Sequence, residues 1–386
     1  MFFSNKKGER NIVLILDIQS SVVRGSLVIV SKIEQPRVIF THSADINFRS
    51  GDSDSLLIKA TLDKIRETIQ FAQRFLHHKE SVIQYTGIRK KITAIHYVLS
   101  SPWIVSEAKV LSKKFDKETE ITQKYVCDLI AEDREKMASS TTEPLQVIEQ
   151  KIFDVRLNNY SICDWEKKMT KVLDVSFTVS VAGKRMVENF IDQCLHIVRS
   201  NKIHFHSSLL LQYIGIEKIL EPGQNYCLIH VHGDETDVSI VKQKACIFFG
   251  SFSIGVRTIV GKIGQLSNLG EQTADSLITL YTGGKLEDDQ NTKNIESISK
   301  VSKEWFSKLK EILMVPKLDI KPPMSVIVTA WTHEDLFVKL IKDAISGVSV
   351  YILSIDDLIA KVSFDGASEK RRLTALHAIA IHSLEE

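Results

Sequence analysis

The chain contains 386 residues, of which 44% are hydrophobic and 25% are charged, and its formal net charge is +2. This length is too great for one ordinary hydrophobic core and indicates two or more subdomains. The nearly balanced charge excludes a global basic field, so no nucleic-acid partner is expected. Five scattered cysteines without a Cys-x-x-Cys spacing exclude a disulfide framework and a zinc signature.

The same cysteine usage fits a reducing cytoplasm. The sequence has no apolar run near the roughly 20 residues that a membrane-spanning helix needs. Its first residues lack the order of charge and apolar stretch that marks a signal peptide. We therefore expect a cytoplasmic protein.

The first hundred residues predict a sheet covered by a long helix. A strand, a turn and a second strand span residues 11–30, and a third strand follows at 36–40. A helix is expected over 54–76, because its apolar residues recur at intervals of three and four and form one buried stripe. A further strand is expected at 92–99, before a turn at Pro102.

Residues 93–178 have the pattern of a small unit inserted into the first domain. The segment "TQKYVCDLIAEDREKM" predicts a helix with Thr122 as its N-cap. Two strand-like stretches surround 152–156 and 172–181, and a helix is expected over 184–198. The alternation of strands and helices on both sides predicts a first domain in two parts, at 1–92 and 179–220.

The second half opens as the first did, with a strand, a turn and a strand over 225–250, which suggests an internal duplication. We expect a second domain at 221–386, with a smaller subdomain at about 264–322. Its further elements are predicted as helices at 256–263, 273–282 and 298–313, a strand at 325–330, a helix at 333–345, a strand at 348–353 and a last helix at 373–384.

Three segments in this order, "LDIQSSVVRGSLV", "IHVHGDETDVSIV" and "VIVTAWTHEDL", resemble the actin/Hsp70/sugar-kinase superfamily of actin-like ATPases. The insert followed by "LDVSFTVSVAGKRMVENFIDQC", with "FGSFSIGVRTIVGKIG" and "ADSLITLYTGG", resembles its FtsA/PilM-type branch. The resemblance covers nearly the whole chain. It implies an α/β fold of two domains that are duplicated copies of one ribonuclease H-like fold. A small α+β insert is expected in the first domain.

In this superfamily two hairpins clamp the phosphates of a nucleotide. The first carries Asp-x-Gly-(Ser/Thr), whose carboxylate reaches a metal-bound water and whose glycine lets the backbone approach a phosphate. This chain keeps Asp17, Ser20 and Ser21 but has Gln19 at the glycine position. The resemblance implies that these four residues would face ATP and that Asp17 would hold Mg²⁺ through water.

The second hairpin departs further from the superfamily pattern Asp-x-Gly-(Gly/Ala)-x-Thr-Thr. His230 replaces the metal-side carboxylate, and His232 replaces the first glycine. Asp234 and Glu235 would put negative charge beside a phosphate, which opposes binding unless a cation screens it. The resemblance assigns three residues of this hairpin to the phosphates: Gly233, Asp234 and Thr236.

Four more residues are implied as nucleotide contacts: Gly255, Asp275, Ala330 and Trp331. The adenosine turn usually carries two glycines, and here Ala330-Trp331 stands in their place. The indole would either stack on adenine or fill its space. The superfamily often has a basic residue three positions after the acidic residue that Asp275 represents, and this chain has Ile278 there. These departures favour a degenerate or weak ATP cleft, with retained binding of ATP and Mg²⁺ as the alternative.

His230 and His232 also allow a metal site, because residues two apart on a strand share a face and Asp234 could be a third ligand. We favour a histidine pair that is either hydrogen-bonded or half-exposed, since no further ligand cluster accompanies them. His204-Phe205-His206 and His77-His78 are expected at helix ends or in loops. The sequence has no nucleophile elbow, Walker loop or His-Glu-x-x-His motif, so no other enzyme class is supported.

The resemblance implies a scaffold or adaptor rather than an active enzyme. The chain ends at "LTALHAIAIHSLEE" without the amphipathic membrane helix of FtsA-like proteins, which favours type IV pilus assembly. Its partner would then be a peptide of an inner-membrane pilus assembly protein, through which the chain attaches to the membrane. Self-association of the scaffold is a further expectation. The alternatives are a cell-division protein with a tubulin-like partner and an active ATPase.

The partner groove of this branch lies between the first domain and the insert. Trp103, beside Pro102, is a candidate exposed anchor for a partner. We favour a position in the core for this residue.

Overall fold

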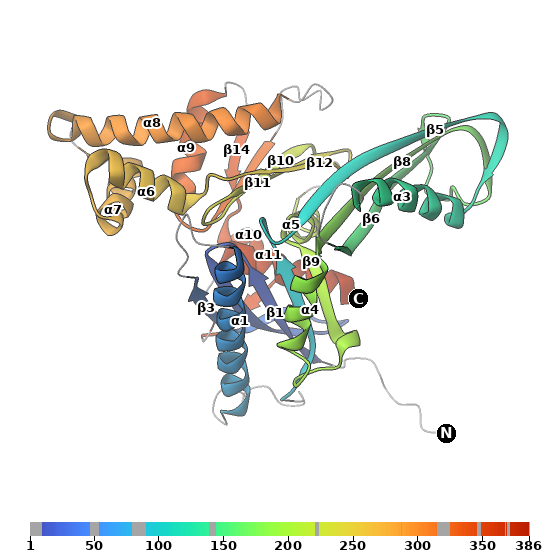
Figure 1. Ribbon diagram of the computed structural model, residues 1–386, viewed down its shortest axis with the longest axis horizontal. Helices are drawn as coiled ribbons and strands as arrows, with labels where there is room; N and C mark the ends of the chain where they lie inside the picture. Colours follow the sequence, from blue (N-terminus) through green and yellow to red (C-terminus); the bar gives the residue numbers. More distant parts are fainter. Residues whose placement is uncertain are drawn as a thin grey trace.

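The structure is a computed structural model. It describes residues 10–46, 54–78, 90–138, 144–220, 224–286, 288–314, 325–345, 349–366, 368 and 371–385. Two larger sheets form the two halves of the molecule, and a third sheet extends to one side (Figure 1).

The first half is built on a six-stranded sheet in the order β15-β3-β2-β1-β4-β9. Its strands are β1 (Asn11–Ile18), β2 (Val22–Val30), β3 (Arg37–Asp45), β4 (Ile92–Leu99), β9 (Ile203–Ser207) and β15 (Ser363–Phe364). Helices α1 (Asp54–His77) and α4 (Lys184–Asp192) bury one face, and α5 (Ser208–Glu217) and α11 (Arg372–Glu385) bury the other. Strand β1 is apolar on both faces because helices cover both.

The second half is built on a five-stranded sheet in the order β12-β11-β10-β13-β14. Its strands are β10 (Tyr226–Val231), β11 (Thr236–Lys242), β12 (Ala245–Phe252), β13 (Ser325–Ala330) and β14 (Ser349–Ile352). One face packs on α6 (Val256–Ser267), α7 (Glu271–Thr282), α8 (Asp288–Leu313) and α9 (Glu334–Ala344). The other packs on α5 and α11, which therefore lie between the two sheets, near the short helix α10 (Ile355–Ile359) (Figure 1).

The two halves repeat one strand pattern, as the sequence predicted. In the first, β1 pairs antiparallel with β2 and parallel with β4, which pairs parallel with β9. In the second, β10 pairs antiparallel with β11 and parallel with β13, which pairs parallel with β14. The duplicated two-domain α/β plan is therefore confirmed.

The insert is an antiparallel sheet in the order β5-β8-β6-β7, with one helix on one face. Its elements are β5 (Val105–Ile121), α3 (Gln123–Ala138), β6 (Leu145–Leu157), β7 (Tyr160–Ser161) and β8 (Lys168–Gly183). The N-cap prediction for α3 is confirmed, because the Thr122 hydroxyl accepts a hydrogen bond from the amide of Tyr125 at 3.2 Å. The α+β nature of the insert is confirmed as well.

The sequence-derived limits of these units need two corrections. The insert was expected to begin at residue 93, but β4 lies inside the first sheet next to β1, so the insert sheet begins at Val105 and continues to Gly183. The second domain was expected to run to residue 386, but β15 pairs with β3 and α11 packs in the core against the first sheet. The end of the chain thus returns to the first half.

Candidate functional site

The turns of the two predicted phosphate hairpins are in direct contact. The amide of Asp234 donates to the hydroxyl of Ser20 at 3.3 Å. A Cβ added to Gly233 would lie 2.0 Å from the Ser21 hydroxyl oxygen, so no atom fits between the two turns there. Gln19, Ser20 and Ser21 are all buried, and the two turns pack directly on each other at Gly233 and Ser21.

Asp17 lies at the end of β1 and is buried beneath this contact. The Gln19 side-chain amide donates to Asp17 Oδ2 at 3.0 Å, and Nη1 of Arg24 lies 3.5 Å from the same oxygen. Burial raises the pKa of Asp17, although the Arg24 charge acts in the opposite direction. The carboxylate predicted to hold Mg²⁺ through water is therefore turned to side chains of its own hairpin.

The N-terminus of α6 is occupied by the second hairpin. The amides of Val256 and Arg257 donate to the carbonyl oxygens of His232 and Gly233 at 2.9 and 2.7 Å. Gly255 permits this packing, because a Cβ there would lie 2.3 Å from the His232 carbonyl oxygen. Helix N–H groups that could otherwise bind an anion are thus bonded to the turn.

Arg257 pairs with Asp234 of the acidic turn, a role that the sequence analysis missed. Its Nε and Nη2 donate to the two oxygens of Asp234 at 3.2 and 2.5 Å, and its Nη1 donates to the carbonyl of Ile46 at 3.0 Å. This bidentate pair supplies a cation beside Asp234, the screening charge that the sequence analysis named as a condition for phosphate binding. Arg257 also ties the second hairpin to the segment that follows β3.

Thr236 uses its hydroxyl within the second half. It donates to the carbonyl oxygen of Ile254 at 2.7 Å and accepts from the indole nitrogen of Trp305 at 3.0 Å. Trp305 is fully buried in the core between the second sheet and its helices. The hydroxyl that was predicted to face a phosphate is therefore committed to this core.

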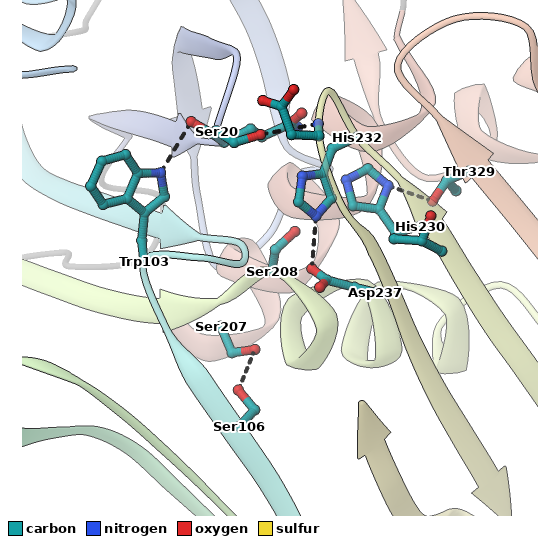
Figure 2. Close-up of polar contacts among 12 residues, drawn as sticks. Ser20, Trp103, Ser106, Ser207, Ser208, His230, His232, Asp237 and Thr329 are labelled. Carbon is teal, nitrogen blue, oxygen red and sulfur yellow. Dashed lines mark hydrogen bonds and ion pairs between the residues drawn. The ribbon is translucent and has the colours of Figure 1, made fainter. Parts of the chain in front are cut away.

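His230 and His232 are both buried, with their rings stacked at 5.3 Å between centroids (Figure 2). His232 Nε2 lies 3.2 Å from an Asp237 oxygen, and His230 Nδ1 lies 3.0 Å from the Thr329 hydroxyl. Burial would lower the pKa of His232, but the Asp237 charge raises it above its usual value. Among the described residues, no three His, Cys, Asp or Glu side chains are placed to hold a metal ion.

A chain of buried hydrogen bonds leads from His230 into the first half. The Thr329 hydroxyl donates to Gln212 at 3.0 Å, and the Gln212 amide donates to Ser208 at 3.1 Å, which lies 3.4 Å from Nε2 of His377. Because the single hydroxyl proton of Thr329 goes to Gln212, the bond between Thr329 and His230 is donated by His230 Nδ1. This His230–His377 chain joins β10 and β13 of the second half to α5 and α11.

Trp103 is a core residue, which confirms the favoured interpretation and rules out the exposed anchor. Its side chain is 6% exposed, and its indole nitrogen donates to the carbonyl oxygen of Gln19 at 3.1 Å (Figure 2). The segment that leaves β4 therefore braces the first hairpin turn from the side of the insert.

A cavity of about 690 Å³ lies beside the closed hairpins. It is lined by three of the residues predicted on the adenosine side: Asp275, Ala330 and Trp331. Asp275 lies 2.6 Å from the ring of His333, which also lines the cavity. The predicted site residues thus divide between this cavity and the hairpin contact.

Arg24 lines the same cavity and was missed by the sequence analysis. It stands alone in the otherwise apolar strand "VVRGSLVIV", and this isolated charge was the available signal. Gln212 and His377 were missed as well, because their segments carry no motif.

No protein-family model and no curated protein matches the sequence. Among solved structures, a PilM–PilN type IV pilus biogenesis complex matches with a TM-score of 0.62 at 13% identity, over 96% of each chain. The ethanolamine utilization protein EutJ from Carboxydothermus hydrogenoformans matches with a TM-score of 0.45 at 10% identity, over 96% of this chain and 89% of EutJ.

A Bacteroides thetaiotaomicron protein with an actin-like ATPase fold and unknown function matches with a TM-score of 0.39 at 11% identity, over 92% of this chain and 94% of that one. The duplicated sheets, the paired hairpins and the PilM likeness define this chain as having the actin-like ATPase fold. Within that class its architecture is of the PilM type. None of the described helices is both long and apolar enough to cross a membrane.

Proposed function

We propose that the chain is an actin-like scaffold of the PilM type that acts in type IV pilus assembly and does not turn over ATP. The absence of ATP turnover is argued from the contact between the hairpin turns, where Gly233 packs on Ser21. The scaffold role in pilus assembly is supported by a structural likeness that extends over 96% of both chains.

Loss of turnover follows from where the polar groups of the cleft are directed. In an active site of this kind, turn amides and a metal-bound carboxylate would face the phosphates. Here the amide of Asp234 is bonded to Ser20, and Asp17 is held by Gln19 and Arg24. Opening the cleft for a triphosphate would break the contact between the turns, and binding Mg²⁺ through Asp17 would compete with Gln19 and Arg24 for its carboxylate.

The partner we propose is a cytoplasmic peptide of an inner-membrane pilus assembly protein, which would hold the chain at the cytoplasmic face of that membrane. The similar PilM structure is a complex with PilN, which supports a partner protein of this kind. We place the peptide on the insert, on the sheet face opposite α3. Lys109 pairs with Asp133 of α3, so the neighbouring Val110 points to that opposite face, and it is 57% exposed.

The test is calorimetric titration of the full chain with synthetic cytoplasmic peptides of inner-membrane pilus assembly proteins encoded near it. We expect saturable binding that Val110→Asp weakens by about tenfold or more, because it puts a charge on an apolar contact. Tyr160→Asp is the matched control, since Tyr160 is 75% exposed on β7 at the other edge of the same sheet. Binding that is equal in both variants would move the site elsewhere.

The same assay addresses the pilus assignment itself. Binding of a tubulin-like division protein, with no binding of any pilus peptide, would assign the chain to cell division instead. Sedimentation of the free chain at increasing concentration then reports whether it also self-associates.

A further inference from the structure

We propose that one edge of the first sheet binds an anionic membrane surface directly. Strands β1, β4 and β9 are parallel, and the carboxyl end of β1 leads into the turn that contacts the second half. Their amino ends therefore lie at the opposite edge, together with the β2–β3 turn, because Val30 pairs with Asn11. In Figure 1 the second half lies above the first, and the carboxyl end of α1 points to this edge.

We call this surface the amino edge, and it comprises residues 10, 31–36, 74–78, 90–91 and 195–202. It is strongly cationic, whereas the formal net charge of the whole chain is only +2. Its one carboxylate is Glu34, which pairs with Arg10. Its Lys and Arg side chains are all exposed, and they are Arg10, Lys32, Arg74, Lys90, Lys91, Arg199 and Lys202. This local excess of positive charge favours an anionic partner.

The positive charge of the amino edge is largely left unneutralised. Within the described part of the chain, Arg10 is the only one of these cations that forms an ion pair. Arg74 lies over the ring of Phe71, which leaves its charge in place. The charge of Lys202 acts on Glu385 of α11, but the ion pair of Glu385 is with His96, at 3.5 Å. The cations are therefore available to a ligand.

Aliphatic side chains project from the same edge. Ile33 in the β2–β3 turn is 68% exposed, and Leu195, in the segment before β9, is 49% exposed. The end of α11 lies against the β2–β3 turn, because His382 Nε2 is 2.7 Å from the carbonyl oxygen of Ser31. This places a third aliphatic side chain nearby, Leu384, which is 50% exposed. Exposed aliphatic groups among cations are typical of a surface that enters the headgroup region of a bilayer.

The aliphatic groups decide between lipid and nucleic acid. A nucleic acid would be bound by the cations and by stacked aromatic rings, and it would gain nothing from an exposed isoleucine. A bilayer uses both kinds of group, since anionic headgroups attract the cations and the interfacial region accepts aliphatic side chains. Each Lys or Arg close to such a surface strengthens binding by about fivefold. We therefore expect a reversible and salt-dependent contact.

This contact goes beyond the adaptor function, in which a partner peptide alone holds the chain at the membrane. A direct contact would be a second signal, and stable attachment to a membrane commonly takes two. It would also orient the chain, with the second half directed away from the bilayer. Either proposal can fail without the other, because the peptide face lies on the insert and the amino edge includes no residue of the insert sheet.

The test is co-sedimentation of the full chain, without any peptide, with vesicles of phosphatidylcholine that contain phosphatidylglycerol and with vesicles of phosphatidylcholine alone. We expect binding to the anionic vesicles only, and weaker binding as the salt concentration rises. Lys90→Gln with Lys91→Gln should weaken this binding by about tenfold or more. The matched control, Lys300→Gln with Lys303→Gln at exposed positions of α8, removes the same charge from the second half and should leave binding unchanged.

Ile33→Ser separates contact with lipid from simple attraction between charges. It should weaken binding to the anionic vesicles by about fivefold, because an aliphatic side chain no longer enters the bilayer. Leu280→Ser, at an exposed position of α7, is its control and should have no effect. All of these side chains are exposed, so the melting temperatures of the variants should match that of the parent chain.

Absence of binding to anionic vesicles, equal binding to both kinds of vesicle, or equal losses in the two lysine double variants would overturn the proposal. Binding to duplex DNA as tight as that to vesicles, with no effect of Ile33→Ser, would mark a nucleic-acid surface instead and would overturn it as well. Peptide titration of the same preparation keeps this result separate from the adaptor function.

Discussion

Gly233 of the second hairpin packs against Ser21 of the first so closely that a Cβ at residue 233 would lie 2.0 Å from the Ser21 oxygen and 2.2 Å from its Cβ. In the superfamily pattern this glycine lets the backbone approach a phosphate. Here the group that it approaches is a serine of the other half. The glycine therefore allows close contact between the two halves of the protein.

This contact predicts a specific rescue. Gly233→Ala should destabilise the chain by about 2 kcal/mol or more, because Ser21 Cβ is fixed to the backbone and cannot rotate away. Ser21→Gly removes both clashing atoms, so the double variant should recover most of the loss. Urea unfolding of the four chains measures the coupling. A Gly233→Ala chain as stable as the parent would mean that the turns are apart in solution.

The His230–His377 chain predicts a second stability effect. Thr329→Val keeps the side-chain shape but leaves His230 Nδ1 and Gln212 Oε1 without their shared partner. Two unsatisfied buried groups should cost about 2–4 kcal/mol in the free energy of unfolding. Thr329→Ser keeps the hydroxyl and should cost clearly less. Equal losses in both variants, measured by urea unfolding, would argue that packing and not hydrogen bonding matters at this position.

Buried histidines predict acid sensitivity. Burial lowers the pKa of His377 and of His230 to about 3, from an ordinary value of 6.5. As the pH falls below about 6.5 the unfolded chain binds protons that the folded chain does not, so stability is complete above that pH and is lost as the pH falls toward 3. Asp237 raises the pKa of His232, so the contribution of His232 to the stability of the fold has the opposite pH dependence. It is present at low pH and is lost as the pH rises.

Besides burial, the charges of three neighbouring groups lower the pKa of His377, and these are His230, Arg24 and His206. His377→Asn should therefore reduce the slope of unfolding free energy against pH between about pH 6 and 4 by nearly one proton. His78→Asn, at the exposed position directly after α1, is the matched control variant. An unchanged slope in His377→Asn would show that this side chain is protonated in the folded state.

Much of the fold could be predicted from sequence where periodicity is strong. Strand β4, strand β13 and helix α1 were found within about one residue of their observed ends, because each carries an uninterrupted apolar run or stripe. Helix α5 was missed because nearly all its residues are buried, so it lacks a polar face. Strand β5 was missed because it is a highly charged edge strand.

The site was predictable only as two separate hairpins. The pattern around Asp17 and that around Gly233 gave their positions, but the distance between the turns depends on how the two halves close. Arg257 and Gln212 act across that closure, and neither lies in a motif. The segment of strand β9 was expected to be a loop or a helix end. Its partner β4 lies on the other side of the insert in the sequence, so this pairing could not be read from local residues.

The central claim is that the phosphate cleft is closed by protein groups. Its most direct test is titration of the purified full chain with millimolar Mg-ATP, with the melting temperature and released phosphate measured on the same sample. A ligand at 100 times its Kd would stabilise the fold by about 2.7 kcal/mol, which such a melt detects readily. We expect a negligible shift and no phosphate release. A large saturable shift or ATP turnover that Asp17→Ala abolishes would contradict the account.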